Sequence, residues 1–212
     1  MKTCYIFGAA QGLPNHFSPS GGDLVIAADG GYESLAALGV IPQLVVGDFD
    51  SLTAIPNGIT IIKHPKEKDD TDMMLAVKIG YERGYRRFVL YGGTGGRMDH
   101  TFANFQVLCW LSHRKARAFL AGEDFTATAI TDDTLRFTKS AEGNISVFAA
   151  AGTAQGVFLD GLAYPLENAT LTADFPLGVS NEFTGEPSSV RVKKGTLLII
   201  FGGGLHYIQE EA

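Results

Sequence analysis

The sequence predicts an α/β protein in which a doubly wound, mostly parallel sheet is followed by an all-β sandwich. Up to about residue 122, short apolar runs of strand type alternate with segments of helical period, as in strands joined by crossover helices. Beyond that point, short β-rich runs follow one another with Gly, Asn, Asp and Pro between them. We therefore expect two domains, residues 1–122 and 123–212.

The first domain is expected to alternate between strands and helices. The strands are expected at 4–7, 24–28, 44–46, 60–63, 87–91 and 116–121. A helical segment at 33–38 is closed by Gly39, and another begins at Thr71, a capping residue, and ends at Gly84. A third helix is expected to begin at Asp99 or Thr101. In such a sheet, ligands bind beyond the carboxyl ends of the strands.

The second domain is expected to be an antiparallel sandwich or a partly open barrel. Its strands are expected at 134–138, 144–148, 156–159, 169–172, 189–192 and 196–201. No helix is expected after the glycines 202–204, so we interpret them as a turn and not as a phosphate loop.

Composition limits the classes of function. The chain has 212 residues, of which 45% are apolar, so it can bury a substantial core. A net charge of −6 without clustered Lys and Arg argues against nucleic acid as a partner. No apolar run predicts a membrane span or a signal peptide. Cys4 and Cys109 lie in apolar patterns and are expected to be reduced, as in a cytoplasmic protein.

Two aspartates follow a strand near the middle of the first domain. Asp48 and Asp50 lie two residues apart in Gly47-Asp48-Phe49-Asp50-Ser51, so an extended backbone would aim both carboxylates to the same side. Like charges in that arrangement repel, which favours either a raised pKa or a divalent cation such as Mg²⁺. An aspartate-rich turn is the structural alternative.

Two further motifs follow strands in the same domain. In Asp29-Gly30-Gly31 the glycines allow the backbone to approach a ligand, although a turn with a helix-capping aspartate is an alternative. In Lys66-Glu67-Lys68-Asp69-Asp70-Thr71-Asp72, Asp72 falls at the start of a helix, where the helix dipole favours it and where it can face a metal. A solvated charged loop is the alternative there.

A fourth motif is the glycine-rich loop Tyr91-Gly92-Gly93-Thr94-Gly95-Gly96-Arg97-Met98-Asp99-His100. Its glycines allow backbone N–H groups to close on phosphate oxygens, and Arg97 adds a forked cation. Neither the Walker pattern nor the dinucleotide pattern is present, so a nucleotide would be held in another way. A structural loop, with His100 in the first turn of a helix, is the alternative.

Taken in order, these motifs resemble those of the thiamine pyrophosphokinase family. The residues that carry the resemblance are Ala28-Asp29-Gly30-Gly31, Gly47-Asp48-Phe49-Asp50-Ser51, Lys68-Asp69-Asp70-Thr71-Asp72 and Gly96-Arg97-Met98-Asp99-His100. Two later segments are similar to motifs of that family's second domain, namely Tyr164-Pro165-Leu166-Glu167-Asn168 and Gly178-Val179-Ser180-Asn181-Glu182-Phe183. The resemblance covers most of the chain.

The resemblance implies an N-terminal domain that binds ATP, a C-terminal sandwich that helps to bind thiamine, and a homodimer with active sites between subunits. The implied reaction transfers the pyrophosphoryl group of ATP to the thiamine hydroxyl and gives thiamine diphosphate and AMP. Mg²⁺ held by carboxylates suits this chemistry, because it neutralises charge on the phosphates.

The resemblance also implies roles for particular residues. The expected Mg²⁺ ligands are Asp48, Asp50 and Asp72. The expected catalytic residues are Asp72, Lys68 and Arg97, of which the last two would hold the triphosphate. The remaining ATP-binding residues are expected to be Asp29, Gly30, Gly31, Thr71, Gly93, Thr94, Asp99 and His100. Ser180 and Asn181 would bind thiamine, a polar turn being the alternative.

Some features leave other functions open. Certain members of the family stack a tryptophan on thiamine, but the sole tryptophan here, Trp110, falls in a helix expected in the first domain. Phe183 is the nearest aromatic candidate for stacking on thiamine.

Two alternative functions stay open. One alternative function is a pyrophosphokinase acting on another heterocyclic alcohol, such as a pterin. Another is a non-catalytic nucleotide-binding module whose sandwich docks a protein.

Overall fold

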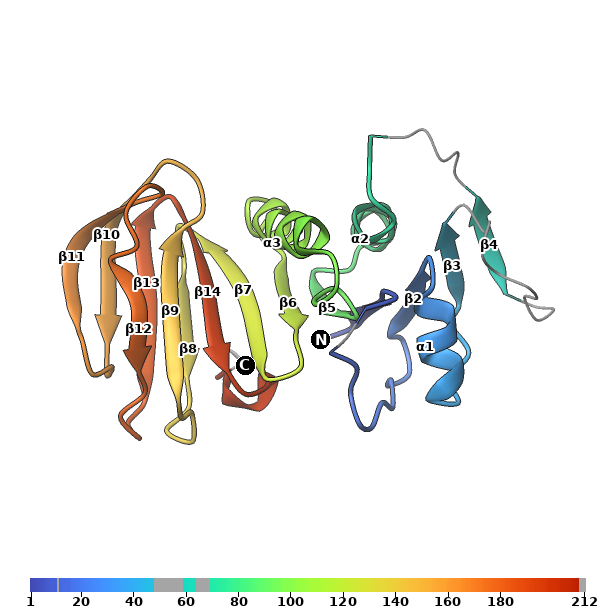
Figure 1. Cartoon of the computed structure of the whole chain (residues 1–212), viewed down its shortest axis with the longest axis horizontal. Coiled ribbons are helices and arrows are strands. Elements are labelled where there is room, and N and C mark those ends of the chain that lie inside the picture. The colour runs from blue at the N-terminus through green and yellow to red at the C-terminus, as the bar shows by residue number, and fades with distance from the viewer. Residues whose placement is uncertain (11, 48–58, 64–68, 210–212) are drawn as a thin grey trace. The chain divides into compact units, whose positions relative to one another are not determined.

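The chain forms two compact units in the computed structural model, which describes residues 1–10, 12–47, 59–63 and 69–209 (Figure 1). The first unit comprises Met1–Val107 with Leu120–Glu123, and the second comprises Leu108–Phe119 with Asp124–Ala212. An α/β part is followed by an all-β part, so the predicted fold class is confirmed. The division into domains at residue 122 stays a prediction.

The first unit contains a parallel sheet with strands in the order β5-β1-β2-β3-β4. The strands are β1 (Thr3–Phe7), β2 (Leu24–Ala28), β3 (Leu44–Gly47), β4 (Thr60–Lys63) and β5 (Arg87–Tyr91). All five were expected from their apolar runs. Their carboxyl ends lie at one edge, because Phe7 of β1 pairs with Ala27 of β2 and with Tyr91 of β5.

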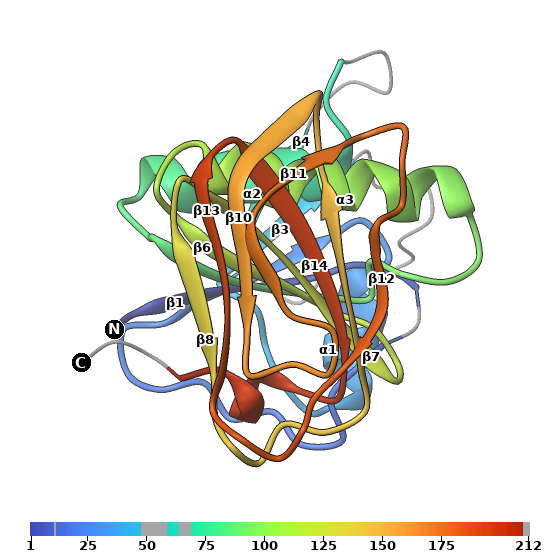
Figure 2. The same ribbon diagram turned by 90° about the vertical axis from the view of Figure 1, so that its left-hand side faces the viewer.

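Helices cover both faces of this sheet, as Figures 1 and 2 show. They are α1 (Gly31–Ala37) and α2 (Asp72–Glu82). Leu35 of α1 packs in a cluster with Phe7, and full burial of such a side chain contributes about 1.5–3 kcal/mol. Gly80 of α2 instead approaches Cys4, whose side chain points to the face opposite to that of Phe7. The sheet is therefore doubly wound, as predicted.

Local signals set the ends of these helices. The hydroxyl of Thr71 accepts a hydrogen bond from the backbone N–H of Met74 at 3.1 Å, which confirms the predicted cap of α2. Gly84 follows the end of α2 with φ of 90°, a conformation that favours glycine. A third helix, α3 (Met98–Ser112), begins one residue before Asp99, and its residues from Leu108 onward belong to the second unit.

The second unit is a β-sandwich, seen in Figure 2 from the side of β10 and β11. One layer has the order β12-β9-β14-β7 and the other β11-β10-β13-β8. The strands are β7 (Phe125–Thr131), β8 (Thr134–Phe137), β9 (Asn144–Ala149), β10 (Thr153–Asp160), β11 (Leu166–Thr172), β12 (Gly178–Glu182), β13 (Ser188–Lys194) and β14 (Thr196–Gly202). Both layers contribute to one core, which includes Phe137, Val147, Val190 and Ile199.

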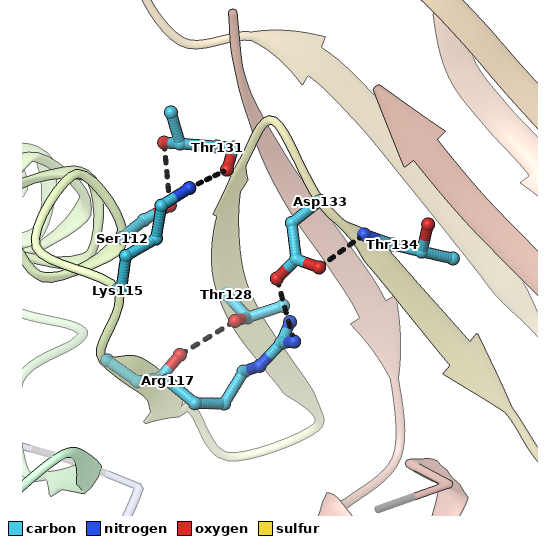
Figure 3. A network of polar contacts seen from close by, with 8 residues as sticks. Ser112, Lys115, Arg117, Thr128, Thr131, Asp133 and Thr134 are labelled. Carbon is cyan, nitrogen blue, oxygen red and sulfur yellow. Dashed lines mark hydrogen bonds and ion pairs between the residues drawn. The ribbon is translucent and has the colours of Figure 1, made fainter. Parts of the chain in front are cut away.

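Polar contacts within the second unit hold the end of α3 and the start of strand β6 (Arg117–Ala121) to β7 and to the turn after it (Figure 3). The hydroxyls of Ser112 and Thr131 lie 2.7 Å apart, and the hydroxyl of Thr128 donates to the carbonyl of Ala118 at 2.7 Å. Arg117 forms an ion pair with Asp133, Nη2 to Oδ2, at 3.0 Å. These contacts fix the start of the sandwich.

Two further observations concern the chain as a whole. Cys4 and Cys109 are both free thiols, Cys4 fully buried and Cys109 partly so. Across the described ranges, no helix is long and apolar enough to cross a membrane.

Candidate active site

A pocket of about 360 Å³ opens at the carboxyl edge of the parallel sheet, entirely within the first unit. Gly8, Asp29 and Gly92, which directly follow β1, β2 and β5, line it. The start of α2 and the start of α3 supply the other walls. The pocket thus lies where an open parallel sheet is expected to bind ligands.

Two glycines let the ends of β1 and β5 approach each other beneath the pocket. A Cβ atom on Gly8 would lie 2.5 Å from the carbonyl oxygen of Gly92, and one on Gly92 would lie 2.2 Å from the carbonyl oxygen of Gly8. The N–H of Gly8 also donates to the carbonyl of Tyr91 at 2.8 Å. A larger residue at either position would force the two backbones apart.

Asp29 occupies an unusual backbone conformation on the wall formed by β2. Its φ is 49°, in the left-handed region that aspartate tolerates better than most residues, and its N–H donates to the carbonyl of Val46 at 2.8 Å. The N-cap of α1 is Gly30, with no side-chain cap. The side chain of Asp29 therefore does not cap α1, and Asp29 lines the pocket.

Gly30 and Gly31 are placed beside the pocket by the start of α1, although neither is among its described lining residues. A Cβ on Gly31 would lie only 1.8 Å from the carbonyl oxygen of Phe7. Glycine at this position is therefore explained by the close packing of α1 on the end of β1.

The acidic wall of the pocket contains two aspartates in different surroundings. Asp70 is held by Lys78 of α2, whose Nζ donates to both carboxylate oxygens at 2.8 and 2.6 Å. Each side chain of that pair is about one third exposed. Asp72 lies in the first turn of α2, where the helix dipole stabilises a negative charge. Thr71, between them, also lines the pocket.

The cationic wall is formed by Arg97, just before α3. Its guanidinium donates to both oxygens of Asp99, with Nε at 3.2 Å from Oδ1 and Nη2 at 2.5 Å from Oδ2. This hydrogen-bonded pair holds the pKa of Asp99 below its usual range and raises the pKa of Arg97. Both side chains are largely exposed, at 63% for Asp99 and 72% for Arg97, so Arg97 lies at the mouth of the pocket.

Other residues of the glycine-rich loop divide into two groups. Gly93 and His100 line the pocket, and His100 is exposed to solvent. Thr94 is buried, with 4% of its surface exposed, and it does not line the pocket.

Asn104 is a polar lining residue that was not expected from the sequence. Asn104 is 6% exposed, and its Nδ2 donates to the carbonyl of Gly93 at 2.7 Å. Arg97, just before α3, lies three residues ahead of His100, and Asn104 lies four residues after it, so the spacing predicts that the three side chains point to the same side. That spacing was the available sequence signal.

Three of the expected site residues lie outside the described part of the chain. They are Asp48, Asp50 and Lys68. Within the described residues, no group of three or more His, Cys, Asp or Glu side chains is close enough to hold a metal ion.

The second unit contains the two residues expected to bind thiamine. Asn181 is 3% exposed, and its Oδ1 accepts from the N–H groups of Tyr164 and Glu182, each at 2.9 Å. Its Nδ2 donates to the carbonyl of Tyr164 at 2.7 Å. Only one N–H of the amide remains for a ligand. Ser180 is exposed, with φ of 57°, and its N–H donates to the hydroxyl of Ser146.

Aromatic side chains in the second unit, as candidates for stacking on thiamine, differ in their burial and contacts. Phe183, the expected stacking candidate, is partly buried, and its ring lies 5.0 Å from that of Phe137. Trp110 lies in the part of α3 assigned to the second unit, with the guanidinium of Arg114 over its ring. Tyr164 is 64% exposed, and Asn181 holds its backbone on both sides. Tyr164 was not singled out from the sequence for this role.

Comparisons with known proteins agree with the two-unit organisation. The sequence matches a family model described as the thiamin pyrophosphokinase catalytic domain over residues 20–120. It matches a second model, the thiamin pyrophosphokinase vitamin B1 binding domain, over residues 133–197. A thiamine pyrophosphokinase of Bacillus subtilis is 28% identical over 187 residues, covering 84% of this chain and 86% of that protein.

Solved structures of similar proteins support the same relationship. A crystal structure of the thiamine pyrophosphokinase from Bacillus subtilis has a TM-score of 0.83 and 26% identity, covering 96% of this chain and 100% of the other. A structure of the enzyme from Geobacillus thermodenitrificans has a TM-score of 0.79 and 25% identity, covering 96% and 98%. Because the two family models together match most of the sequence in the expected order, the chain belongs to the thiamine pyrophosphokinase family.

Proposed function

We propose that the pocket of the first unit is where this enzyme transfers the pyrophosphoryl group of ATP to the hydroxyl of thiamine, giving thiamine diphosphate and AMP. The observation that carries this proposal is that Asp29, Asp72 and Arg97 line one pocket. Carboxylates beside a forked cation suit a metal-bound polyphosphate better than an uncharged ligand.

The pocket's oxygen donors fit Mg²⁺. We propose that Asp29 and Asp72, which line the pocket, face the ion together with Asp48 and Asp50. Asp70 is not included, because Lys78 donates to both of its carboxylate oxygens. Mg²⁺ is commonly held by one or two carboxylates together with substrate phosphates and water. When bound, it neutralises charge on the phosphate oxygens.

The protein's own groups position the triphosphate. We propose that Arg97 binds phosphate oxygens through two N–H groups, with Lys68 adding a second cation. Thr71 and the start of α3 lie on the same pocket, and backbone N–H groups at a helix N-terminus favour anions. Gly30, Gly31 and Thr94 shape the surrounding backbone, while Asp99 orients Arg97. Positioning and charge neutralisation then supply much of the rate.

The thiamine side is proposed to involve the edge of the sandwich at β12. Ser180 is exposed there, and Asn181 holds Tyr164 while retaining one free N–H. The exposed ring of Tyr164 is suited to stack on the cationic thiamine, because aromatic faces attract cations. We propose residues 1–122 as the catalytic domain and 123–212 as the thiamine-binding domain.

Exposed apolar side chains support the proposal of a homodimer with active sites between subunits. They include Tyr164, Phe175, Leu177 and Val179, each about half exposed or more. Val179 lies on β12, the last strand of its layer, and the edge of a sheet with apolar side chains is usually covered. We propose that a second copy of the chain covers this edge.

We also propose that the enzyme acts in the cytoplasm.

The decisive experiment is to measure AMP formation by the purified chain with Mg²⁺ and ATP, with and without thiamine, followed by mass analysis of the product. Thiamine-dependent AMP together with thiamine diphosphate is expected. AMP formed only with a different heterocyclic alcohol, such as a pterin, would reassign the substrate. ATP binding without AMP formation in any of these reactions would favour a non-catalytic nucleotide-binding module.

A further inference from the structure

Asn104 is a buried polar side chain on the wall of the pocket that the proposed reaction does not yet use. It is 6% exposed, although asparagine is usually found at the surface. The hydrogen bond from its Nδ2 to the carbonyl of Gly93 anchors it at 2.7 Å. A side chain that is both buried and part of a ligand pocket needs a partner for each of its polar atoms.

The bond to Gly93 fixes which atom of the Asn104 amide remains for a ligand. A carbonyl oxygen only accepts hydrogen bonds, so the nitrogen of the amide must face Gly93. Among the described residues no hydrogen bond to the amide oxygen, Oδ1, is found, and Oδ1 is not one of the fully buried atoms without a partner, so water or a ligand can reach it. Asn104 therefore offers the pocket the acceptor Oδ1 in a defined orientation, beside the second N–H of Nδ2. A ligand group that meets Oδ1 must supply an N–H or O–H.

The surroundings of Asn104 do not suit a phosphate. A Cβ built on Gly93 would lie 2.8 Å from a methyl of Leu120, 2.9 Å from Nδ2 of Asn104 and 3.5 Å from the terminal methyl of Met73, so apolar methyl groups lie beside the amide in this corner. Phosphate oxygens accept hydrogen bonds and carry negative charge, so they would be repelled by Oδ1. The cation that would attract them, Arg97, lies at the exposed mouth.

The spacing along α3 separates these two ends of the pocket. Asn104 lies seven residues beyond Arg97, about 10 Å along the helix axis, and His100 lines the pocket between them. A molecule with an anionic end and an uncharged end that donates hydrogen bonds would match both. A nucleotide has this character, because its ribose and base carry O–H and N–H donors away from the phosphates.

We propose that Asn104 recognises the nucleoside of ATP by accepting a hydrogen bond from the amino group of the base or from a ribose hydroxyl. This inference rests on the proposed function only in taking ATP as the nucleotide. Asn104 would thereby act as a specificity residue, while its bond to Gly93 positions the glycine-rich loop.

The test compares ATP with three analogues that each lack one donor. They are purine riboside triphosphate, which lacks the amino group, 2′-deoxy-ATP and 3′-deoxy-ATP. Dissociation constants are measured by calorimetry with Mg²⁺ and without thiamine, for the wild type and for Asn104→Ala and Asn104→Asp. We expect the wild type to prefer ATP over the analogue that lacks the recognised donor by about threefold to tenfold.

The two variants separate recognition from positioning. Asn104→Ala removes the acceptor, so the preference should fall to about one. Asn104→Asp keeps acceptor oxygens but loses the bond to Gly93, so it should bind all four nucleotides more weakly and keep the preference. Gln106→Ala, an exposed amide on the same helix, is the matched control and should keep the wild-type constants. Circular dichroism checks that each variant is folded.

Several outcomes would overturn the inference. The first is that the wild type binds ATP and all three analogues with equal affinity. The second is that Asn104→Ala keeps the wild-type preference for ATP. The third is that Asn104→Ala raises the KM for thiamine while its nucleotide binding is unchanged. The last result would place the acceptor against thiamine. The dissociation constants are measured without turnover. A wild type that makes no AMP would therefore refute the proposed reaction, whereas the preference for ATP over its analogues would still test the role of Asn104.

Discussion

Asp99 holds the guanidinium of Arg97 at the mouth of the pocket, although Asp99 is not itself among the residues that line the pocket. A two-point contact fixes the plane of a guanidinium as well as its position. The relationship therefore suggests a division of roles, in which Arg97 meets the phosphates and Asp99 orients it.

Loss of this pair should weaken ATP binding through Arg97. Asp99→Asn is expected to raise the dissociation constant for ATP by up to about fivefold, since the pair is exposed and such pairs contribute little. Arg97→Lys, which keeps the charge but loses the fork, should have a larger effect of about tenfold or more. If Asp99 acts only through Arg97, the double variant should bind ATP no more weakly than Arg97→Lys alone.

The pH dependence of the Asp99→Asn effect follows from the direction of the pKa shift. The pKa of Asp99 is lowered by Arg97, so the carboxylate loses its charge only as the pH falls below the usual range of aspartate. The effect of Asp99→Asn on ATP binding should thus be constant between about pH 6 and 8.

The double variant of Asp99→Asn and Arg97→Lys tests whether Asp99 acts through Arg97. Additive losses of ATP affinity in that variant would instead indicate that Asp99 contacts the nucleotide directly.

Asp72 and Asp70 offer a comparison of two neighbouring carboxylates. Asp72→Asn should abolish AMP formation while circular dichroism stays native, because the proposed metal would lose a charged ligand. Asp70→Asn should leave the Mg²⁺ concentration for half-maximal activity unchanged, since both oxygens of Asp70 are bound by Lys78. Wild-type turnover in Asp72→Asn, or a Mg²⁺ requirement that shifts only in Asp70→Asn, would reverse this assignment.

Ser180 and Asn181 should separate substrate binding from stability. Ser180→Ala is expected to raise the KM for thiamine with ATP binding unchanged. Asn181→Ala should lower the free energy of unfolding by about 2–4 kcal/mol, because three hydrogen bonds of a buried amide are lost. Urea unfolding together with KM for both substrates provides the check. Equal weakening of both substrates by Ser180→Ala would contradict a role confined to thiamine.

Much of the fold could be predicted from the sequence where one local signal dominates. The apolar runs of β1, β2 and β5 have a single interpretation, and Thr71 marks the start of α2. Among the strands that the structure describes, β7 and β12 were not predicted. β7 is built largely from Thr and Ala and lacks a strong apolar run, while β12 is an edge strand with polar residues, so burial could not be seen in either sequence.

The candidate site was predictable where chemistry is concentrated in short motifs. Asp29, Asp72 and Arg97 each stand in such a motif, and the pocket brings them together. Asn104 was missed because it lies within a largely apolar helix, where only its spacing from Arg97 and His100 marked it. The pairing of Asp70 with Lys78 was also missed, because it depends on how the loop before α2 folds back on the helix.

The contact of α2 with the sheet at Gly80 gives a test of the packing that supports the pocket. In an open helix interior, Gly→Ala is stabilising by about 0.5–1 kcal/mol. Here a Cβ would lie 2.7 Å from Sγ of Cys4 and 2.8 Å from a ring carbon of Phe88, and overpacking of a core costs about 1–3 kcal/mol. Because overpacking outweighs the gain in helix propensity, Gly80→Ala should lower the free energy of unfolding by about 1–2 kcal/mol. In a Cys4→Ala background the loss should be smaller, because the sulfur is gone, and the difference can be measured by urea unfolding of the four proteins. A Gly80→Ala variant that is more stable than the wild type would show that α2 can move off the sheet without cost.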